Sequence, residues 1–428
     1  MNDVTIKQLN DELYTISKTI TGPVLFDYVC WVLNESYARG IKKLYFAARD
    51  GYVLQKIAKQ ICEKYGLDIE CRYLYCSRKA LRMPTYHLIG DEAYDLLLMS
   101  GTSVTLRSLM ERAELNENER RKVYAELDFY FDKEKEELSK LQLYTISKKI
   151  RESITYRGFI DQKSRQAYEP AMGYFIQEGL LDGNIIAIVD SGWTGSIQRS
   201  LRQLLESSGK HVNLIGFYFG MYVPPKEKAD GEYLCWYFDH KSPKRYKILF
   251  NNNVLECMLS APHGMTLNYK ADGARGWEPV LNDNHHTNML RLIETQINAI
   301  LEYVNDSLSK ANSIRFNAAN TSSKARKLLQ RVMVHPTRSE AEAIGTFAFC
   351  DDITEFYQRP LADESQITAL KNYMILPRII RKLLRKKKKY EINELFWVYG
   401  TISFLPAYKR WWYRLNVYIW EWLRYTLK

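Results

Sequence analysis

Glycine, proline and long apolar runs are scarce in this chain. Only 21 glycines and 12 prolines occur among its 428 residues, which favours regular helices and strands. The length is enough for two or three domains with a sizeable core. No run of about 18 uncharged apolar residues occurs, so no membrane-spanning helix is expected. The polar segment from Met1 to Lys18 lacks the apolar core of a signal peptide.

The seven cysteines are scattered, and no pair has the C-x-x-C spacing. Cys71 and Cys76 lie in an apolar, strand-like run, so we expect reduced core thiols in a cytoplasmic protein. The seven histidines show no metal-binding spacing either. Cysteine and histidine therefore predict neither a zinc site nor a disulfide framework.

The net charge of +11 comes from one segment. Residues 371–428 hold 14 Lys or Arg and 3 Asp or Glu (14 − 3 = 11), and residues 1–370 are neutral, with 47 of each sign. Five of the nine tryptophans also lie there, from Trp397 to Trp422. Basic and aromatic residues together, including an amphipathic basic stretch at 377–389, suit an anionic membrane surface better than a nucleic acid. A C-terminal helix packed on the core would also account for some tryptophans.

Two strand–loop–helix–strand units predict an α/β fold with a parallel sheet. In the first, the apolar run Ile41–Ala48 precedes a helix and the strand Glu70–Cys76. In the second, Ile185–Val189 precedes a helix and the strand Val212–Phe219. The unbroken apolar run at 185–189 is typical of a strand buried on both faces.

Helical patterns account for most of the remaining chain. We divide the sequence into an α/β core, a helical insertion, a helical region and a basic aromatic tail, at 1–83 with 181–280, 84–180, 281–370 and 371–428. Within the insertion, Arg120-Arg121-Lys122 is expected on a solvated helix face. Ser339-Glu340-Ala341-Glu342 has the pattern of a capping box and should start a helix.

Each unit carries a glycine-bearing loop after its first strand, at Arg49-Asp50-Gly51 and at Asp190-Ser191-Gly192-Trp193-Thr194-Gly195-Ser196. Such loops lie at the carboxyl ends of parallel strands, where the N-terminus of the following helix attracts phosphate. Thr194, Gly195 and Ser196 supply hydroxyl and N–H donors for it. Considered alone, the second loop is explained equally well by a tight structural turn as by a phosphate site. The first loop, considered alone, is explained better by a surface Arg–Asp pair than by a phosphate site.

Other polar residues extend this expected site. Arg49 offers a fork for phosphate oxygens, and Asp50 and Asp190 are candidate ligands for Mg²⁺. Further candidates for holding a phosphorylated ligand are Tyr52, Ser77, Arg78 and Lys79, with Arg82 nearby. Glu256 and His263, in the segment ECMLSAPHG, are candidate bases, and a purely structural role is at least as compatible with each.

Three motifs, FAARDGY, YLYCSRKAL and VDSGWTGSIQ, resemble those of the glycan phosphoribosyltransferase family of bacterial surface-polysaccharide synthesis. Members of that family are often described as haloacid-dehalogenase-like hydrolases. The resemblance covers about residues 20–80 and 180–265. The two loops also resemble the pyrophosphate and phosphate loops of type I phosphoribosyltransferases, so the resemblance implies a phosphoribosyltransferase-like core.

The resemblance implies transfer of 5-phosphoribose from phosphoribosyl diphosphate to a lipid-linked glycan of an O-antigen or capsule. A separate phosphatase would then remove the 5-phosphate to leave ribofuranose. By position, Asp190 would contact the ribose diol or Mg²⁺, the residues Thr194–Ser196 would hold the 5-phosphate, and Arg49–Gly51 the diphosphate. Ser191 departs from the two adjacent acidic residues of ordinary phosphoribosyltransferases.

Two alternatives remain beside this cytoplasmic enzyme, peripheral to the inner face of the bacterial membrane. One is a haloacid-dehalogenase-like phosphatase, which is disfavoured because neither Phe26-Asp27-Tyr28-Val29 nor Asp190-Ser191-Gly192 supplies the D-x-D pair. The other is a membrane-associated protein that binds a phosphorylated ligand without catalysis.

Overall fold

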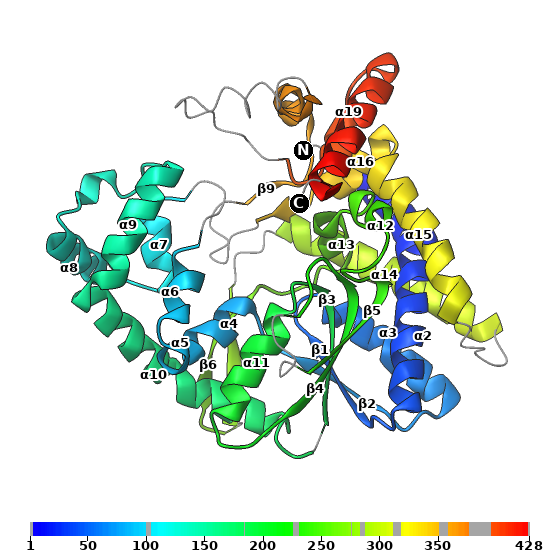
Figure 1. Cartoon of the computed structure of the whole chain (residues 1–428). Helices are drawn as coiled ribbons and strands as arrows, with labels where there is room; N and C mark the ends of the chain where they lie inside the picture. The colour runs from blue at the N-terminus through cyan, green and yellow to red at the C-terminus, as the bar shows by residue number, and fades with distance from the viewer. Residues whose placement is uncertain are drawn as a thin grey trace.

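A five-stranded, all-parallel sheet lies at the centre of the computed structural model, which describes residues 3–99, 104–183, 185–225, 231–274, 276–282, 287–310, 318–350, 358–375 and 395–426 (Figure 1). The strand order is β2-β1-β3-β4-β5. The strands are β1 (Lys43–Ala47), β2 (Glu70–Leu74), β3 (Ile185–Trp193), β4 (Asn213–Met221) and β5 (Glu232–Phe238). The predicted α/β class and parallel sheet are therefore confirmed.

The direction of winding reverses between β1 and β3. β1 pairs with β2 on one side, from Lys43↔Glu70 to Ala47↔Leu74. On its other side it pairs with β3, where Leu44 lies opposite Ala187. The chain therefore leaves the ends of β1 and β3 in opposite directions, and such a point is where open parallel sheets bind their ligands.

β3 is longer than the sequence predicts. It continues to Trp193, with Gly192 paired to Gly220 and Trp193 to Met221. The expectation that Asp190, Ser191, Gly192 and Trp193 form a loop is therefore wrong. A Cβ on Gly192 would lie 2.5 Å from the Gly220 carbonyl oxygen, so only glycine lets the two strands stay paired this far.

Helices cover both faces of the sheet (Figure 1). On one face lie α1 (Asp3–Ile16), α2 (Gly22–Ala38), α3 (Gly51–Tyr65), α13 (Asn252–Met258), α14 (Thr287–Lys310), α15 (Ala318–Val334) and α16 (Arg338–Gly345). On the other lie α4 (Arg78–Arg82), α11 (Ser196–Glu206) and the second half of α10 (Ile154–Gln177). Phe46 packs into the first layer, whereas Tyr45 and Ala47 pack into the second, as alternation along a strand requires.

The remaining helices and strands outside the helical insertion complete the fold. They are the π-helix η1 (Ser17–Thr21), the 3₁₀ helices η2 (Met83–Thr85), η3 (Phe131–Lys133) and η5 (Glu364–Tyr373), α12 (Lys244–Ile248), α18 (Val398–Ile402), α19 (Ala407–Thr426), and the strands β6 (Thr266–Asp272), β7 (Gly276–Leu281), β8 (Ala348–Phe349) and β9 (Arg359–Pro360). The antiparallel hairpin β6–β7 packs against α10. No helix of the described ranges has both the length and the apolar character that crossing a membrane requires.

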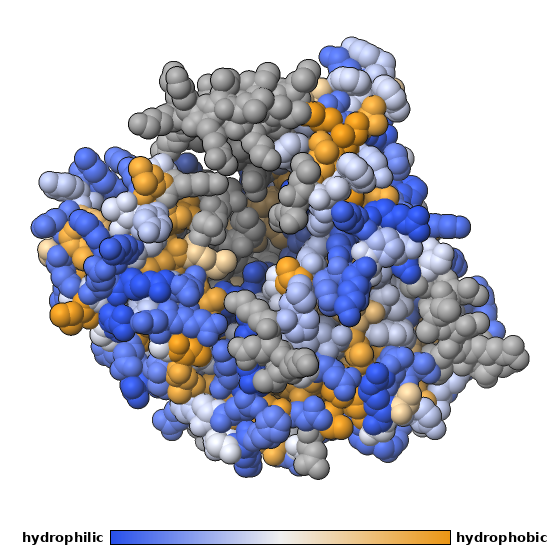
Figure 2. Space-filling view, viewed as in Figure 1, coloured by the Kyte–Doolittle hydropathy of each residue, from blue (hydrophilic) through white to orange (hydrophobic). Residues whose placement is uncertain are grey.

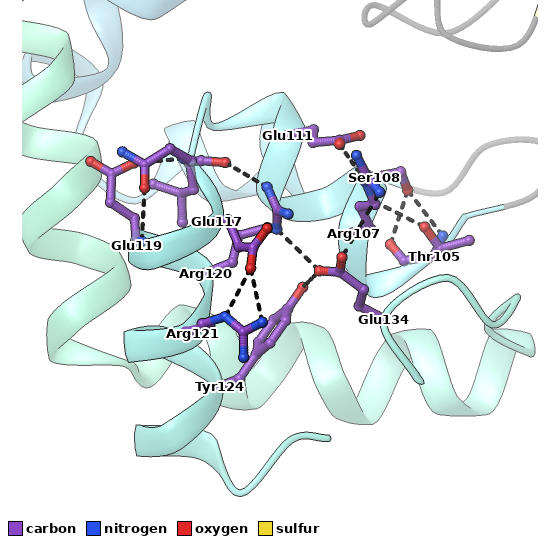
Figure 3. A network of polar contacts seen from close by, with 12 residues as sticks. Thr105, Arg107, Ser108, Glu111, Glu117, Glu119, Arg120, Arg121, Tyr124 and Glu134 are labelled. Atoms are coloured by element: carbon purple, nitrogen blue, oxygen red, sulfur yellow. Dashed lines mark hydrogen bonds and ion pairs between the residues drawn. The ribbon is translucent and has the colours of Figure 1, made fainter. Parts of the chain in front are cut away.

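The helical insertion forms a lobe with its own apolar core, which extends from Met83 to Ile160. Its helices are α5 (Tyr86–Ile89), α6 (Glu92–Leu97), α7 (Leu106–Arg112), α8 (Glu117–Leu127), α9 (Lys140–Glu152) and the first half of α10. Arg120 is not on a solvated face as expected: it is buried, and its Nε donates to Glu134 Oε2 at 3.0 Å (Figure 3). The Tyr124 hydroxyl donates to the same oxygen at 3.1 Å, so a polar network fixes the lobe from inside.

A capping box does begin α16, but two residues earlier than the sequence predicts. The Thr337 hydroxyl accepts from the Glu340 N–H at 3.2 Å, and the Glu340 carboxylate accepts from the Thr337 N–H at 2.8 Å. Thr337 has the extended backbone that a capping residue needs, whereas Ser339 is already inside the helix. The predicted helix is thus confirmed and its predicted start is wrong.

A substitution at Gly51 tests how closely α3 must approach β1. A Cβ at Gly51 would lie 2.6 Å from the backbone carbon of Phe46, so Gly51→Ala should lower the free energy of unfolding by about 1–3 kcal/mol through overpacking. Gly158→Ala on α10 is the matched control, because a Cβ there meets nothing within 4 Å and alanine favours a helix by up to about 1 kcal/mol. Urea unfolding of both variants measures the difference, and equal effects would contradict the close approach.

Candidate functional site

The ends of β1 and β3, together with α13, bring three carboxylates together: Asp50, Asp190 and Glu256. Asp190 is buried near the end of β3, and Asp50 and Glu256 are half-buried. Asp50 is the residue before α3, and Glu256 lies on α13. The two predicted loops therefore do meet at one edge of the sheet.

Like charge and burial make this cluster unfavourable when fully ionised. Burial raises the pKa of Asp190 to about 8, and the nearby Asp50 carboxylate contributes to the rise. Burial likewise raises the pKa of Glu256 to about 7, again with a contribution from Asp50. The pKa of Asp50 is raised by burial too, against the opposing effects of Ser191, Arg49 and Arg78. The cluster should therefore bind a proton or a cation readily.

Ser191 joins the two halves of the site. Its hydroxyl donates to the Asp50 carboxylate, and its main-chain N–H donates to the Asp190 carboxylate. Ser191 stands where ordinary phosphoribosyltransferases have a second acidic residue, and here it donates hydrogen bonds to both Asp50 and Asp190. A second carboxylate in its place would add charge to a cluster that already repels itself.

Trp193 positions Glu256. Its backbone has a φ of +72°, and its indole Nε1 donates to Glu256 Oε1 at 2.7 Å. The ring packs against Tyr222 and Phe250, with centroids 6.0 and 5.5 Å away. The indole ring is therefore packed on both aromatic neighbours, and its N–H holds the Glu256 carboxylate in place.

The turn from β3 into α11 has the features of a phosphate site. Gly195 has a φ of +66°, and a Cβ on it would lie 2.4 Å from Tyr233 Cε1, so the turn requires glycine. α11 then begins at Ser196, and a helix leaves its first N–H groups without partners inside the helix. Thr194 is exposed and Ser196 half-exposed beside these donors. Three residues of the predicted second loop thus retain the geometry expected of them.

Three arginines lie near one another, and one of them, Arg78, also lies near the carboxylates. Burial lowers the pKa of Arg82, and the nearby Arg78 and Arg199 guanidinium groups lower it further. Arg78 also acts electrostatically on Asp50 and Glu256. Positive groups placed this close repel one another, which favours the binding of an anion between them.

Several predicted site residues have structural partners instead. The Ser77 hydroxyl caps α4 by accepting from the Ala80 N–H at 2.9 Å, and it donates to the Thr266 carbonyl at 2.6 Å. Lys79 Nζ lies 3.1 Å from Glu114 Oε1, so this lysine ties the core to the helical lobe. Gly51 provides close packing rather than conformational freedom, since its φ is not positive.

His263 lies one layer behind the carboxylates. Its Nε2 is 2.7 Å from the Tyr73 hydroxyl, and its Nδ1 is 2.8 Å from the Gly264 carbonyl oxygen. The rings of Tyr52 and Tyr75 lie against it. Of the two candidate bases, only Glu256 therefore lies among the acidic groups.

Three further residues belong to this site and were not identified from the sequence. The Tyr28 hydroxyl donates to the carbonyl oxygens of Asp190 and Phe217 at 3.1 and 2.8 Å and so fixes the end of β3. Asn252 is hydrogen-bonded to Glu256. Arg199 lies one helical turn after Ser196, and that spacing was the signal that could have identified it.

Two carboxylates of this site fit a hydrated magnesium ion, although they do not form a larger cluster of metal ligands. Within the described ranges, no three His, Cys, Asp or Glu side chains are grouped to hold a metal ion. Asp50 and Asp190 nevertheless place negative charge where a cation would relieve it. Mg²⁺ commonly binds one or two carboxylates and completes its shell with water and substrate phosphates, so these two residues are sufficient protein ligands.

Comparison with known proteins gives no further guidance. No model of a protein family matches the chain, and no curated protein matches it. The functional conclusion therefore rests on the geometry of the site.

Asp190→Asn tests the burial of charge at this site. Because the pKa of Asp190 rises from 3.8 to about 8 on folding, ionisation opposes folding increasingly as the pH rises between these values. The substitution should therefore raise the free energy of unfolding at pH 8 by more than about 1 kcal/mol relative to its effect at pH 4. Denaturant unfolding at both pH values gives the comparison. Asp182→Asn, at an exposed position, serves as the control, and a loss of stability for Asp190→Asn that is equal at the two pH values would contradict the assignment.

Proposed function

We propose that this chain transfers 5-phosphoribose from phosphoribosyl diphosphate to a hydroxyl group of a glycan. The observation that carries the proposal is the cluster of Asp50, Asp190 and Glu256 beside Arg78, at the point where the winding of the sheet reverses. A donor of this kind has a ribose between a monophosphate and a diphosphate. It therefore needs separate anion sites, and its diphosphate needs a cation. A phosphoribosyltransferase-like core is part of the same proposal.

The donor would use both ends of the site. The 5-phosphate would lie at the start of α11, where Thr194, Ser196 and the first N–H groups of the helix offer donors. The diphosphate would lie toward Arg49 and Arg78. Asp50 and Asp190 would hold Mg²⁺, which would neutralise charge on the departing diphosphate.

Glu256 would accept the proton of the acceptor. The bond between the anomeric carbon and the diphosphate oxygen breaks, and its electron pair leaves with the diphosphate. The acceptor oxygen forms the new bond to the anomeric carbon, and its proton passes to the Glu256 carboxylate, which Trp193 holds in place. A pKa of about 7 lets Glu256 release that proton near neutral pH.

A lipid-linked acceptor is supported by the outer face of α19. Tyr408, Trp411, Trp412 and Trp422 are 78%, 68%, 51% and 46% exposed, and helical spacing places them along one stripe. Figure 2 shows orange and pale-blue residues side by side over α19 at its upper right, and pale blue is the colour that tryptophan and tyrosine take on this hydropathy scale. Trp397, by contrast, is buried and donates to the Met333 carbonyl at 2.8 Å. The basic stretch 377–389 lies outside the described residues.

In this proposal the enzyme works in the cytoplasm at the inner face of a bacterial membrane, in the synthesis of an O-antigen or capsule. Trp and Tyr prefer the interface between lipid and water, and basic residues are drawn to anionic lipids. The chain has no D-x-D pair at either place where a dehalogenase-like phosphatase would carry it. A separate phosphatase would therefore remove the 5-phosphate.

Turnover of phosphoribosyl diphosphate with Mg²⁺ and a lipid-linked glycan tests the reaction. Diphosphate release should depend on the acceptor, and kcat should rise as the pH passes about 7, where Glu256 ionises. Glu256→Gln should lower kcat by about 10²–10⁴-fold and leave donor affinity unchanged. Asp190→Asn should weaken Mg²⁺-dependent donor binding in calorimetry.

The exposed Asp182→Asn variant is the control for both measurements and should match the wild type. Phosphate release without an acceptor would favour a hydrolase instead. Tight donor binding without any product would favour a non-catalytic binding protein.

The double substitution Trp411→Ala and Trp412→Ala tests membrane association. Removal of two exposed indoles from the outer face of α19 should weaken binding to phosphatidylglycerol vesicles by roughly tenfold or more. Vesicle co-sedimentation measures it, with Tyr37→Ala as the control, since Tyr37 is 73% exposed on α2, away from α19. Equal binding by all three proteins would exclude this helix as the membrane contact.

A further inference from the structure

Apart from the carboxylate cluster, a cavity of about 740 Å³ lies between the core and the C-terminal helix α19. Its core side is formed by Tyr222 and the segment 247–253, which leads into α13. Its other side is formed by the inner face of α19, with Trp420, Glu421 and Tyr425. A volume of this size is typical of a site for a small organic ligand.

The cavity adjoins the carboxylates. Asn252 lines it and is hydrogen-bonded to Glu256. Tyr222 also lines it, and its ring packs against Trp193, the residue that holds Glu256. Glu256 acts electrostatically on Tyr222, as do Tyr425 and Arg424 of α19. Glu256 therefore lies directly behind the inner wall of the cavity.

The lining has the chemistry of a sugar site. Aromatic rings from Tyr222, Trp420 and Tyr425 offer flat apolar surfaces, and Asn252 and Glu421 offer polar groups between them. Asn251 and Asn253 both donate to the Phe396 carbonyl at 3.0 Å, which fixes the shape of the wall. The charged groups of the lining already have protein partners: Glu421 is paired with Arg424 at 2.9 Å, and Lys247 Nζ donates to the His240 carbonyl oxygen at 2.6 Å.

We propose that this cavity binds the neutral saccharide end of the acceptor and directs one of its hydroxyl groups toward the wall formed by Tyr222 and Asn252, behind which Glu256 lies. The inference rests on the proposed transferase function. It also explains the two faces of α19, since the outer stripe would meet the lipid while the inner face holds the sugar attached to it. One helix would thus bring a lipid-linked substrate to the carboxylates.

Saturation-transfer NMR with methyl galactoside, methyl mannoside, N-acetylglucosamine and lactose tests the proposal on the full chain. At least one of these saccharides should bind, and Tyr425→Ala should weaken its binding by about tenfold. Trp411→Ala is the matched control on the outer face of the same helix and should bind as the wild type does. Calorimetry with phosphoribosyl diphosphate and Mg²⁺ on the same proteins should show unchanged donor binding.

Saccharide binding that Tyr425→Ala leaves unchanged would overturn the proposal. So would a wild-type protein that binds the donor and none of the four saccharides, or a cavity that binds decyl phosphate in their place. Glu421→Gln, which replaces the carboxylate by a neutral amide of the same size and should also weaken saccharide binding, gives a second test should Tyr425→Ala melt at a lower temperature. A wild type that binds a saccharide but neither binds nor consumes the donor would refute the proposed function and leave the sugar site standing.

Discussion

The hydrogen bonds from Ser191 to Asp50 and to Asp190 determine how this site is built. They hold two carboxylates against each other at the ends of β1 and β3, where burial raises the pKa of both and repulsion from Asp50 raises that of Asp190 further. Such an arrangement is unfavourable for the empty protein and is relieved when a cation or a proton arrives. The same bonds tie the two strand ends at the reversal point, so the shape of the ligand site and its affinity for cations have one origin.

Close backbone contacts make those bonds possible. Gly192 lets β3 run beside Gly220 of β4, which carries Trp193 far enough along to reach Glu256 on α13. Gly51 lets α3 start against Phe46, which places Asp50 at the end of β1. Each glycine therefore acts on the site through the position of the acidic or aromatic residue beside it.

Local pattern was enough to predict four of the five strands of the sheet, β5 being missed, but only part of the site. Apolar runs such as Ile185–Val189 are recognised because a strand covered on both faces is apolar throughout. The extension of β3 from Asp190 to Trp193 was missed because it begins with Asp190 and contains Gly192, and aspartate and glycine are both depleted in strands.

Contacts between segments that are distant in the sequence could not be predicted from local pattern either. Asn252 and Arg199 join the site only because α13 and α11 reach the same edge of the sheet. Arg120 was wrongly expected on a solvated helix face because its partner, Glu134, lies outside α8, just after η3. What the sequence did supply is the set of residues that follow the strands directly, since topology alone brings those together.

The two substrates of the proposed reaction would approach Glu256 from different sides. Arg78, Arg82 and Arg199 come from α4 and α11, which cover one face of the sheet. Tyr222 and the inner face of α19 lie beyond Trp193 on the other side of the carboxylates. A displacement at the anomeric carbon needs the entering and leaving oxygens on opposite sides of that carbon. Arginines behind the diphosphate, and behind the acceptor a cavity whose charged groups are already paired within the protein, would meet that need.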